Sequence, residues 1–273
     1  MGLVYALIAA GLSLIFGLME IVNFAHGEFL MVALYVAFFG WALARLDPLV
    51  SLPLTAAILA VLGWATYHGI IRWVLDGPML AQIFATFGLG VLLRSAAQFA
   101  FGIDFRTVSQ PLLAGRLSMG PVFVGVPQLA ASVTALLAFL ALYLFLSRSE
   151  TGLALQATAQ DRQAAALMGI DTQRMFALGW AVGSACVGVA GGLLAMFFYI
   201  FPDVGAPFAL LAYVTVALGG FGNVPATLLA GVLVGLVEAL GGLMVTPALK
   251  YALVFLMYLA VVLWRPQGLF GRF

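Results

Sequence analysis

Long apolar runs separated by short polar stretches extend over the whole chain. A membrane-spanning helix needs about 20 mostly apolar residues. Runs near this length cover residues 1–19, 29–44, 53–71, 79–101, 121–146, 175–200, 207–240 and 248–264. The run 207–240 is too long for one simple span, and a glycine-rich stretch followed by Pro225 divides it. The pattern predicts one all-α domain over residues 1–273, a polytopic transmembrane helix bundle of eight to nine segments with broken or re-entrant helices.

Composition supports this class and excludes several others. The chain is 65% hydrophobic and 8% charged, with a mean hydropathy of +1.18, whereas soluble domains are about 25% charged. A net charge of +1 is too small to indicate binding to nucleic acid or to acidic partners. One cysteine, Cys186, cannot form an internal disulfide, and with two histidines the chain lacks the ligands of a metal site. The N-terminus lacks the basic region of a signal peptide, so we expect the first run to be a retained span.

The basic residues predict an orientation. Cytoplasmic loops carry an excess of Lys and Arg. Three arginines lie in the loop 147–174 and two in the C-terminal tail, so we place both in the cytoplasm and the loop 102–120 outside. An even number of crossings must then separate the two cytoplasmic regions. The run 207–240 is therefore expected to cross twice.

A first candidate site follows the first apolar run. Asn23, His26 and Glu28 lie between two apolar runs. Polar groups at membrane depth are costly unless they face protein or water, so this stretch is either an interfacial loop with a helix cap or a broken helix beside a translocation path. Glu28 is the strongest candidate for a charge partner. Arg94, inside the run 79–101, is expected to snorkel or to form a structural pair.

A second candidate site is the polar stretch 150–171. Its helix-forming residues and near-helical apolar spacing predict a short helix, with Gly169 at the C′ position. Ala164, Ala165 and Ala166 would present small side chains, so we expect Ala165→Trp to block docking without unfolding the helix. The stretch is either an amphipathic helix on the membrane surface or a helix that docks on another protein.

A third candidate site is the glycine-rich break at 218–223. Gly222 and Asn223 form either a simple helix break or a re-entrant turn that lines a pore. Glu238, near the end of the following helix, is an ionisable residue inside an apolar segment. Such residues are functional candidates by default.

Four segments resemble the permeases of bacterial branched-chain amino acid ABC transporters. They are NFAHGEF at 23–29 with YALIAAGLSLIFG at 5–17, GLALQATAQDRQAAALMGID at 152–171, the glycine-rich turn, and RPQGLFG at 265–271. Residues 163–169 also resemble the EAA-x3-G motif of ABC importers, with Gln163 where the motif has Glu. The family usually carries further residues before the part that matches Gly2, so either the first span is shortened here or the start of the chain is assigned late.

The resemblance implies a function and its partners. Asn23, His26, Glu28, Gly222, Asn223 and Glu238 become candidates for the translocation path, and Asp161, Gln163, Ala164, Ala165 and Gly169 candidates for coupling to an ATPase within the cytoplasmic loop 147–174. A second homologous permease, two cytoplasmic ATPases and a periplasmic binding protein are the expected partners, besides membrane lipid in the bacterial inner membrane.

The energy source is expected to lie outside this chain. A P-loop needs a lysine followed by Ser or Thr, but the only lysine, Lys250, precedes Tyr251. We therefore expect no bound cofactor and no catalytic residue, with ATP and Mg²⁺ on the partner ATPases. Branched-chain amino acids are the expected substrates, and urea, short amides or aromatic acids are alternatives. An ion-coupled secondary transporter is the runner-up, and an intramembrane enzyme is a third possibility.

Overall fold

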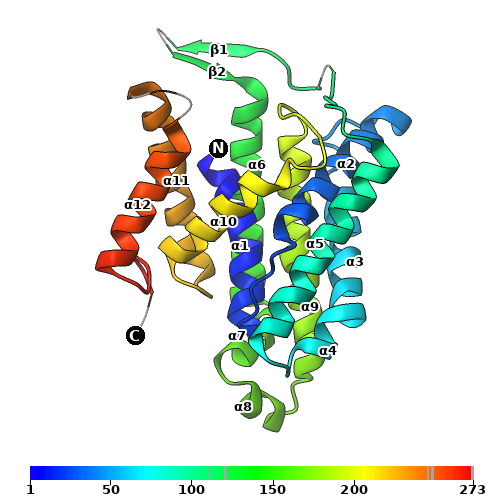
Figure 1. Cartoon of the computed structure of the whole chain (residues 1–273), viewed down its shortest axis with the longest axis vertical. Coiled ribbons are helices and arrows are strands. Elements are labelled where there is room, and N and C mark those ends of the chain that lie inside the picture. Colours follow the sequence, from blue (N-terminus) through cyan, green and yellow to red (C-terminus); the bar gives the residue numbers. More distant parts are fainter. Residues whose placement is uncertain (110, 120–121, 245, 247–248, 272–273) are drawn as a thin grey trace.

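The computed structural model describes residues 1–109, 111–119, 122–244, 246 and 249–271 of the chain. Helices dominate it, with one short β-hairpin (Figure 1). The elements are α1 (Gly2–Met19), α2 (His26–Ala44), α3 (Leu52–Thr66), the π-helical turn η1 (Tyr67–Ile71), α4 (Arg72–Val74), α5 (Met79–Phe101), β1 (Arg116–Met119), β2 (Val122–Gly125), α6 (Val126–Arg148), α7 (Glu150–Gln160), α8 (Arg162–Leu167), α9 (Thr172–Leu194), α10 (Gly205–Gly219), α11 (Val224–Met244) and α12 (Lys250–Trp264).

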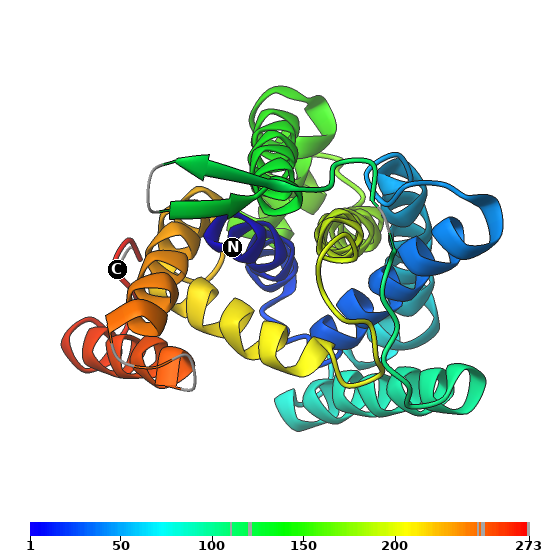
Figure 2. The same ribbon diagram turned by 90° about the horizontal axis from the view of Figure 1, so that it is seen from above.

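Helices α1 and α9 form the centre of the bundle, and the other long helices surround them (Figure 2). Small residues allow the two central helices to approach closely. A Cβ added at Gly183 of α9 would lie 2.8 Å from the carbonyl oxygen of Gly11 in α1. Lipid gives no hydrophobic drive between helices, so close backbone packing is the main source of their association.

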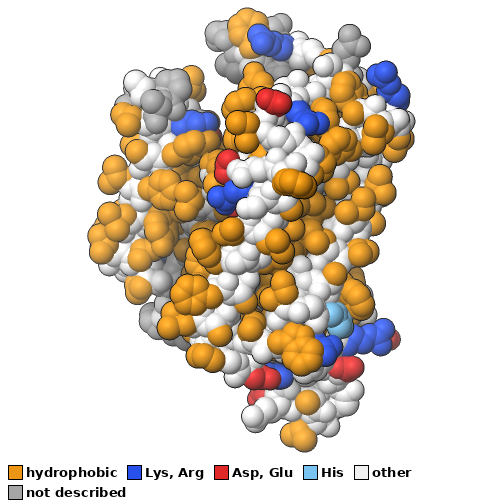
Figure 3. Space-filling view, turned by 45° about the vertical axis from the view of Figure 1, so that its right-hand side comes forward, with side chains coloured by type: hydrophobic (Ala, Val, Ile, Leu, Met, Phe, Trp, Pro, Cys, Tyr) orange, Lys and Arg blue, Asp and Glu red, His pale blue; other side chains and the backbone are white. Residues whose placement is uncertain are grey.

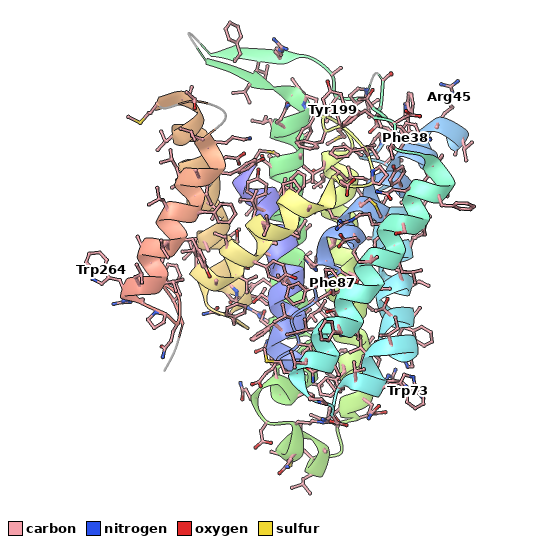
Figure 4. The ribbon with its side chains drawn as sticks, in the orientation of Figure 1. Phe38, Arg45, Trp73, Phe87, Tyr199 and Trp264 are labelled. Atoms are coloured by element: carbon pink, nitrogen blue, oxygen red, sulfur yellow. The ribbon has the colours of Figure 1, made fainter. Side chains whose placement is uncertain are left out.

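The outer helices present an apolar surface of the kind that a bilayer covers. Among the described residues, seven helices are long and apolar enough to cross a membrane, and α10 and α12 are shorter apolar helices. Trp73 and Tyr199 are 71% and 61% exposed and lie near opposite ends of the molecule (Figure 4). Aromatic residues at both ends are typical of membrane–water interfaces.

The order of the helices agrees with the predicted orientation. Helices α7 and α8 and the C-terminal end of α12 lie toward one end of the bundle, and the β-hairpin lies at the other (Figure 1). Four separate helices, α9 to α12, lie between the two arginine-bearing regions that we place in the cytoplasm. The expected division of the run 207–240 is confirmed, because α10 ends at Gly219 and α11 begins at Val224.

Three details differ from the pattern of apolar runs. The run 121–146 does not begin as a helix: Val122–Gly125 pairs with Arg116–Met119 as an antiparallel hairpin before α6 starts. Alternating and β-branched residues favour a strand there. The run 29–44 starts earlier, at His26, so His26 and Glu28 lie in the first turn of α2. The stretch 150–171 forms two helices, α7 and α8, because Asp161 has an extended backbone.

Candidate functional site

A non-helical segment, residues 20–25, interrupts the chain between α1 and α2, and its residues Ile21, Asn23 and Ala25 are buried. Helix α1 ends at Glu20, whose φ of 58° is left-handed, and α2 has no side-chain cap. The segment is visible in dark blue between α10 and α5 in Figure 1. Irregular backbone is tolerated at membrane depth only where protein or a water-filled cavity satisfies its polar groups. The predicted helix break is therefore present, and its backbone groups need partners.

Neighbouring helices supply those partners from both sides. Tyr213 of α10 donates its hydroxyl to the carbonyl oxygen of Asn23 at 2.6 Å. Thr86 of α5 donates to the carbonyl of Val22 at 3.2 Å. The side chain of Asn23 accepts a hydrogen bond from the amide of Ala25 at 3.1 Å, as in a local turn. The segment is thus held between α5 and α10.

The first turn of α2 is fixed against α1 and α10. His26 is fully buried, and its Nε2 donates to the carbonyl oxygen of Ile8 at 2.9 Å. Gly27 faces Gly205, the first residue of α10: a Cβ at Gly27 would lie 2.6 Å from the Gly205 carbonyl oxygen. His26 therefore joins two helices, and its role in translocation stays a prediction.

Glu28 has the partner that its burial requires. The carboxylate forms an ion pair with Arg94 of α5, and the same guanidinium lies 3.6 Å from Asp203 in the turn before α10. The Glu28 side chain is only 7% exposed. Removing Arg94 alone would leave a buried charge without a counter-charge, which costs about 3–5 kcal/mol. Glu28 thus has the charge partner that we expected it to need, and Arg94 forms a structural pair, although the sequence did not match these two residues with each other.

Helix α5 carries one continuous seam toward this cluster. Thr86, Gly90 and Arg94 recur at intervals of four residues and therefore lie on one helix face. Gly90 lets α5 approach, because a Cβ there would lie 3.3 Å from a Glu28 carboxylate oxygen. The same helix also carries exposed rings, including Phe87 (Figure 4).

Gly222 and Asn223 lie away from this cluster, in the turn between α10 and α11. Asn223 is the N-cap of α11: its Oδ1 accepts from the amide of Ala226 at 3.2 Å, and its Nδ2 donates to the carbonyl of Phe270 at 3.3 Å. Gly222 has a φ of 78° and packs against Gly17 of α1. Both residues have clear structural tasks, and their place on a path stays a prediction.

A cavity of about 720 Å³ adjoins this turn. The end of α1, the turn itself and the junction of α6 and α7 line it, with Glu20, Gln156 and Asn223 among the polar contributors. It lies at the end of the bundle that carries α7 and α8. Glu238, by contrast, is buried between α11 and α12, where Lys250 donates to its carboxylate at 2.7 Å. The six path candidates therefore fall into three separate places.

The coupling candidates gather on α8. Asp161 caps this helix by accepting from the amides of Gln163 and Ala164 at 2.8 and 2.9 Å. Gly169 has a φ of 85° and donates to the carbonyl of Ala166. Together with the bond from Ile170 to Ala165, this closes the helix in a Schellman motif. The predicted C′ position of Gly169 is confirmed.

One coupling expectation is wrong. Ala165 is only 4% exposed, while Ala164 and Ala166 face outward. A tryptophan at position 165 would have to displace packed neighbours, so this substitution cannot report on docking alone. The sequence did not single out Leu167 and Met168, which are 88% and 82% exposed at the tip of the molecule. Their position before a helix-ending glycine is the signal that could have identified them.

The part of the chain that the structure describes holds no cluster of metal-binding side chains. No three His, Cys, Asp or Glu side chains gather there as metal ligands. Cys186 is a free, buried thiol. The described arrangement consists of buried ion pairs, an interrupted helix and an exposed helical tip.

Comparisons with known proteins point to one family. A family model described as "Branched-chain amino acid transport system / permease component" matches residues 1–262. The permease protein BraD of the high-affinity branched-chain amino acid transport system of Pseudomonas aeruginosa is 30% identical over 99% of this chain and 92% of its own length. LivH of Escherichia coli K12 is 30% identical over 100% and 92%. A probable LivH of Methanocaldococcus jannaschii is 26% identical over 86% and 76%. No solved structure matches the chain.

Proposed function

Because the chain belongs to the family of branched-chain amino acid transport permeases, we propose that it is the membrane-spanning subunit of an ATP-driven importer of leucine, isoleucine and valine. The match over residues 1–262 carries this conclusion. The related proteins are named as permeases of high-affinity branched-chain amino acid transport systems. The chain is a multi-pass inner-membrane protein, in agreement with its seven long apolar helices.

The bundle has nine membrane segments in this proposal. Seven are the long apolar helices, and α10 and α12 are the other two. Each of these has 15 residues, about 22 Å of helix, which is shorter than the ~30 Å hydrocarbon core. Segments of this length are suited to the inside of a bundle or to a locally thinner membrane.

Helix α8 is the element that docks on an ATPase. Leu167 and Met168 are almost fully exposed at the end of the bundle that also carries α7. Large exposed apolar side chains beyond the apolar belt are typical of protein contacts. Asp161 and Gly169 fix both ends of the helix and so hold this tip in one conformation. Ala164 and Ala166 leave room for a partner surface to approach.

The proposed transporter contains further subunits that hydrolyse ATP, complete the translocation path and deliver the substrate. Two cytoplasmic ATPases bind ATP and Mg²⁺, since this chain lacks a P-loop lysine. A second homologous permease completes the path, and a periplasmic binding protein delivers the substrate at the end that carries the β-hairpin.

Transport by the reconstituted complex tests the proposal. The chain is co-produced with its partner permease and ATPases, placed in proteoliposomes, and supplied with the leucine-loaded binding protein. We expect uptake of radiolabelled leucine that requires ATP and competes with isoleucine and valine. Uptake driven by an ion gradient without ATP would instead identify a secondary transporter. ATP-driven uptake of urea, amides or aromatic acids but not leucine would reject the substrate assignment.

A paired substitution tests the docking helix. We expect Leu167→Ser together with Met168→Ser to leave membrane insertion unchanged, because exposed side chains contribute little to folding. The ATPases should no longer co-purify, and uptake should fall with them. Phe123→Ser is the matched control for ATPase co-purification, since Phe123 is 71% exposed on β2 at the opposite end. Full ATPase retention by the paired variant would refute docking through α8.

A further inference from the structure

The charge cluster of α2, α5 and the turn before α10 has an uncovered side. Glu28 is buried, but the Arg94 side chain is 38% exposed and the Asp203 side chain 55%. Figure 3 shows basic and acidic side chains side by side on a largely apolar face, separate from the charges at the two ends. Two charged groups of opposite sign are therefore accessible at one place on this face.

The depth of the cluster makes lipid an unfavourable neighbour. Arg94 lies seven residues before the end of α5, about 10 Å along the helix axis at 1.5 Å per residue. Ionisable residues at such depth face the bundle interior or a water-filled cavity, since hydrocarbon does not solvate them. The face between α5 and α10 must therefore adjoin water or another protein group.

The cluster has binding capacity that its own members leave unused. Nε of Arg94 is buried and has no hydrogen-bond partner within the described residues, so a ligand can reach only the exposed part of this side chain, which is 38% exposed overall. The outward part of the guanidinium can donate to a further acceptor, and planar guanidinium groups bind carboxylates in a bidentate manner. Two carboxylates against one guanidinium leave a formal charge of −1, and the exposed Asp203 carboxylate can accept from a cation.

From this geometry we propose that Arg94 and Asp203 bind the two charged groups of a zwitterionic α-amino acid during its passage. This inference rests on the proposed function and adds the residues that recognise the substrate. An α-amino acid carries its ammonium and carboxylate on one carbon. Both groups can therefore reach Asp203 and Arg94, whose charged atoms are 3.6 Å apart. Glu28 holds the guanidinium in place from the buried side.

Apolar surface for the substrate side chain lies beside the charges. Phe24 is 40% exposed, and its ring lies 5.9 Å from that of Tyr213. Gly90 faces both Glu28 and the backbone of Ala25, the residue after Phe24, so the ring and the ion pair come from neighbouring positions of one segment. A branched aliphatic chain can lie on this pair of rings while its charged end contacts Arg94 and Asp203.

Two variants separate binding from support of the fold. Glu28→Gln combined with Arg94→Gln removes both charges of the buried pair, so no buried charge is left without a partner. Asp203→Asn changes only an exposed carboxylate. The complete complex is measured for second-permease co-purification, ATP hydrolysis stimulated by the binding protein, and leucine uptake. We expect assembly and stimulated hydrolysis to persist, while leucine imported per ATP falls roughly 10- to 100-fold, the effect of losing one charged hydrogen bond.

Matched controls use exposed charges at the same end of the molecule. Arg45→Gln and Asp104→Asn change the same residue types where the side chains are exposed, and that of Arg45 points outward (Figure 4). Both should import leucine at the wild-type rate.

Three outcomes overturn the inference. Uptake by both test variants within twofold of wild type would show that the cluster only supports the fold. Loss of the second permease would show that it is a subunit contact. If the wild-type complex imports no amino acid, the proposed function fails, and this assignment fails with it. The first of these outcomes, with a wild type that imports leucine, rejects the binding role alone and leaves the proposed function standing.

Discussion

The contact between Gly27 and Gly205 should determine how tightly the interrupted segment is held. We consider Gly27→Ala. The added Cβ would lie 2.6 Å from the Gly205 carbonyl oxygen and 2.9 Å from the Ala209 Cβ. Carbon–oxygen contacts normally lie at about 3.3–3.6 Å, so α2 and α10 would have to separate by about 0.7–1 Å. Because the opposing atom is backbone, no rotamer change can relieve the overlap.

Moving α2 and α10 apart lowers the free energy of unfolding in two ways. Overpacking costs about 1–3 kcal/mol. The hydrogen bond from Tyr213 to Asn23, now 2.6 Å, would lengthen beyond the usual 2.5–3.0 Å range for O–H···O bonds, which loses about 0.5–1.5 kcal/mol. Alanine favours the helix by up to ~1 kcal/mol. The net loss is about 1–3 kcal/mol.

Thermal unfolding of the detergent-solubilised protein, followed by size-exclusion chromatography after heating, measures this loss. Gly27→Ala should lower the midpoint by several degrees. Gly88→Ala on α5 is the matched control, since no atom outside its own helix neighbourhood lies within 4 Å of the added Cβ. It should keep or raise the midpoint. Equal midpoints for the two variants would refute the argument that backbone contact between α2 and α10 limits this position.

Two further predictions concern single turns. Gly169→Val should destabilise α8, because a β-branched residue at a φ of 85° costs about 1–2 kcal/mol. ATPase co-purification should drop, while the unfolding midpoint of the bundle stays constant. Unchanged co-purification would contradict the role of this turn. Asn223→Ala should lower the thermal unfolding midpoint, because the N-cap contributes about 1 kcal/mol to the stability of α11. Asn223→Asp keeps a capping oxygen and should have a midpoint close to that of the wild type. If both variants behave alike, the cap is not what stabilises α11.

Local features of the chain were predictable because their causes are local. Span 79–101 coincides with α5, since a continuous apolar run leaves few alternatives in a membrane. The break after Gly219 and the C′ role of Gly169 follow from the conformational freedom of glycine. The boundary of α2 was missed by three residues because His26 and Glu28 are polar. Their partners make a helical first turn possible, and those partners lie on other helices.

Contacts between distant segments were only partly accessible from sequence. The charge of Glu28 indicated that a partner was needed, and Arg94 was expected to snorkel or to form a structural pair, but nothing in the sequence matched the two residues with each other. Asp203 carried no such signal, because it follows an apolar run where an acidic residue is ordinary at an interface. Asp203 lies near Arg94 because Gly205 allows the start of α10 to pack closely against α2. A glycine two residues away thus decides that an unremarkable surface carboxylate lies beside a guanidinium at membrane depth.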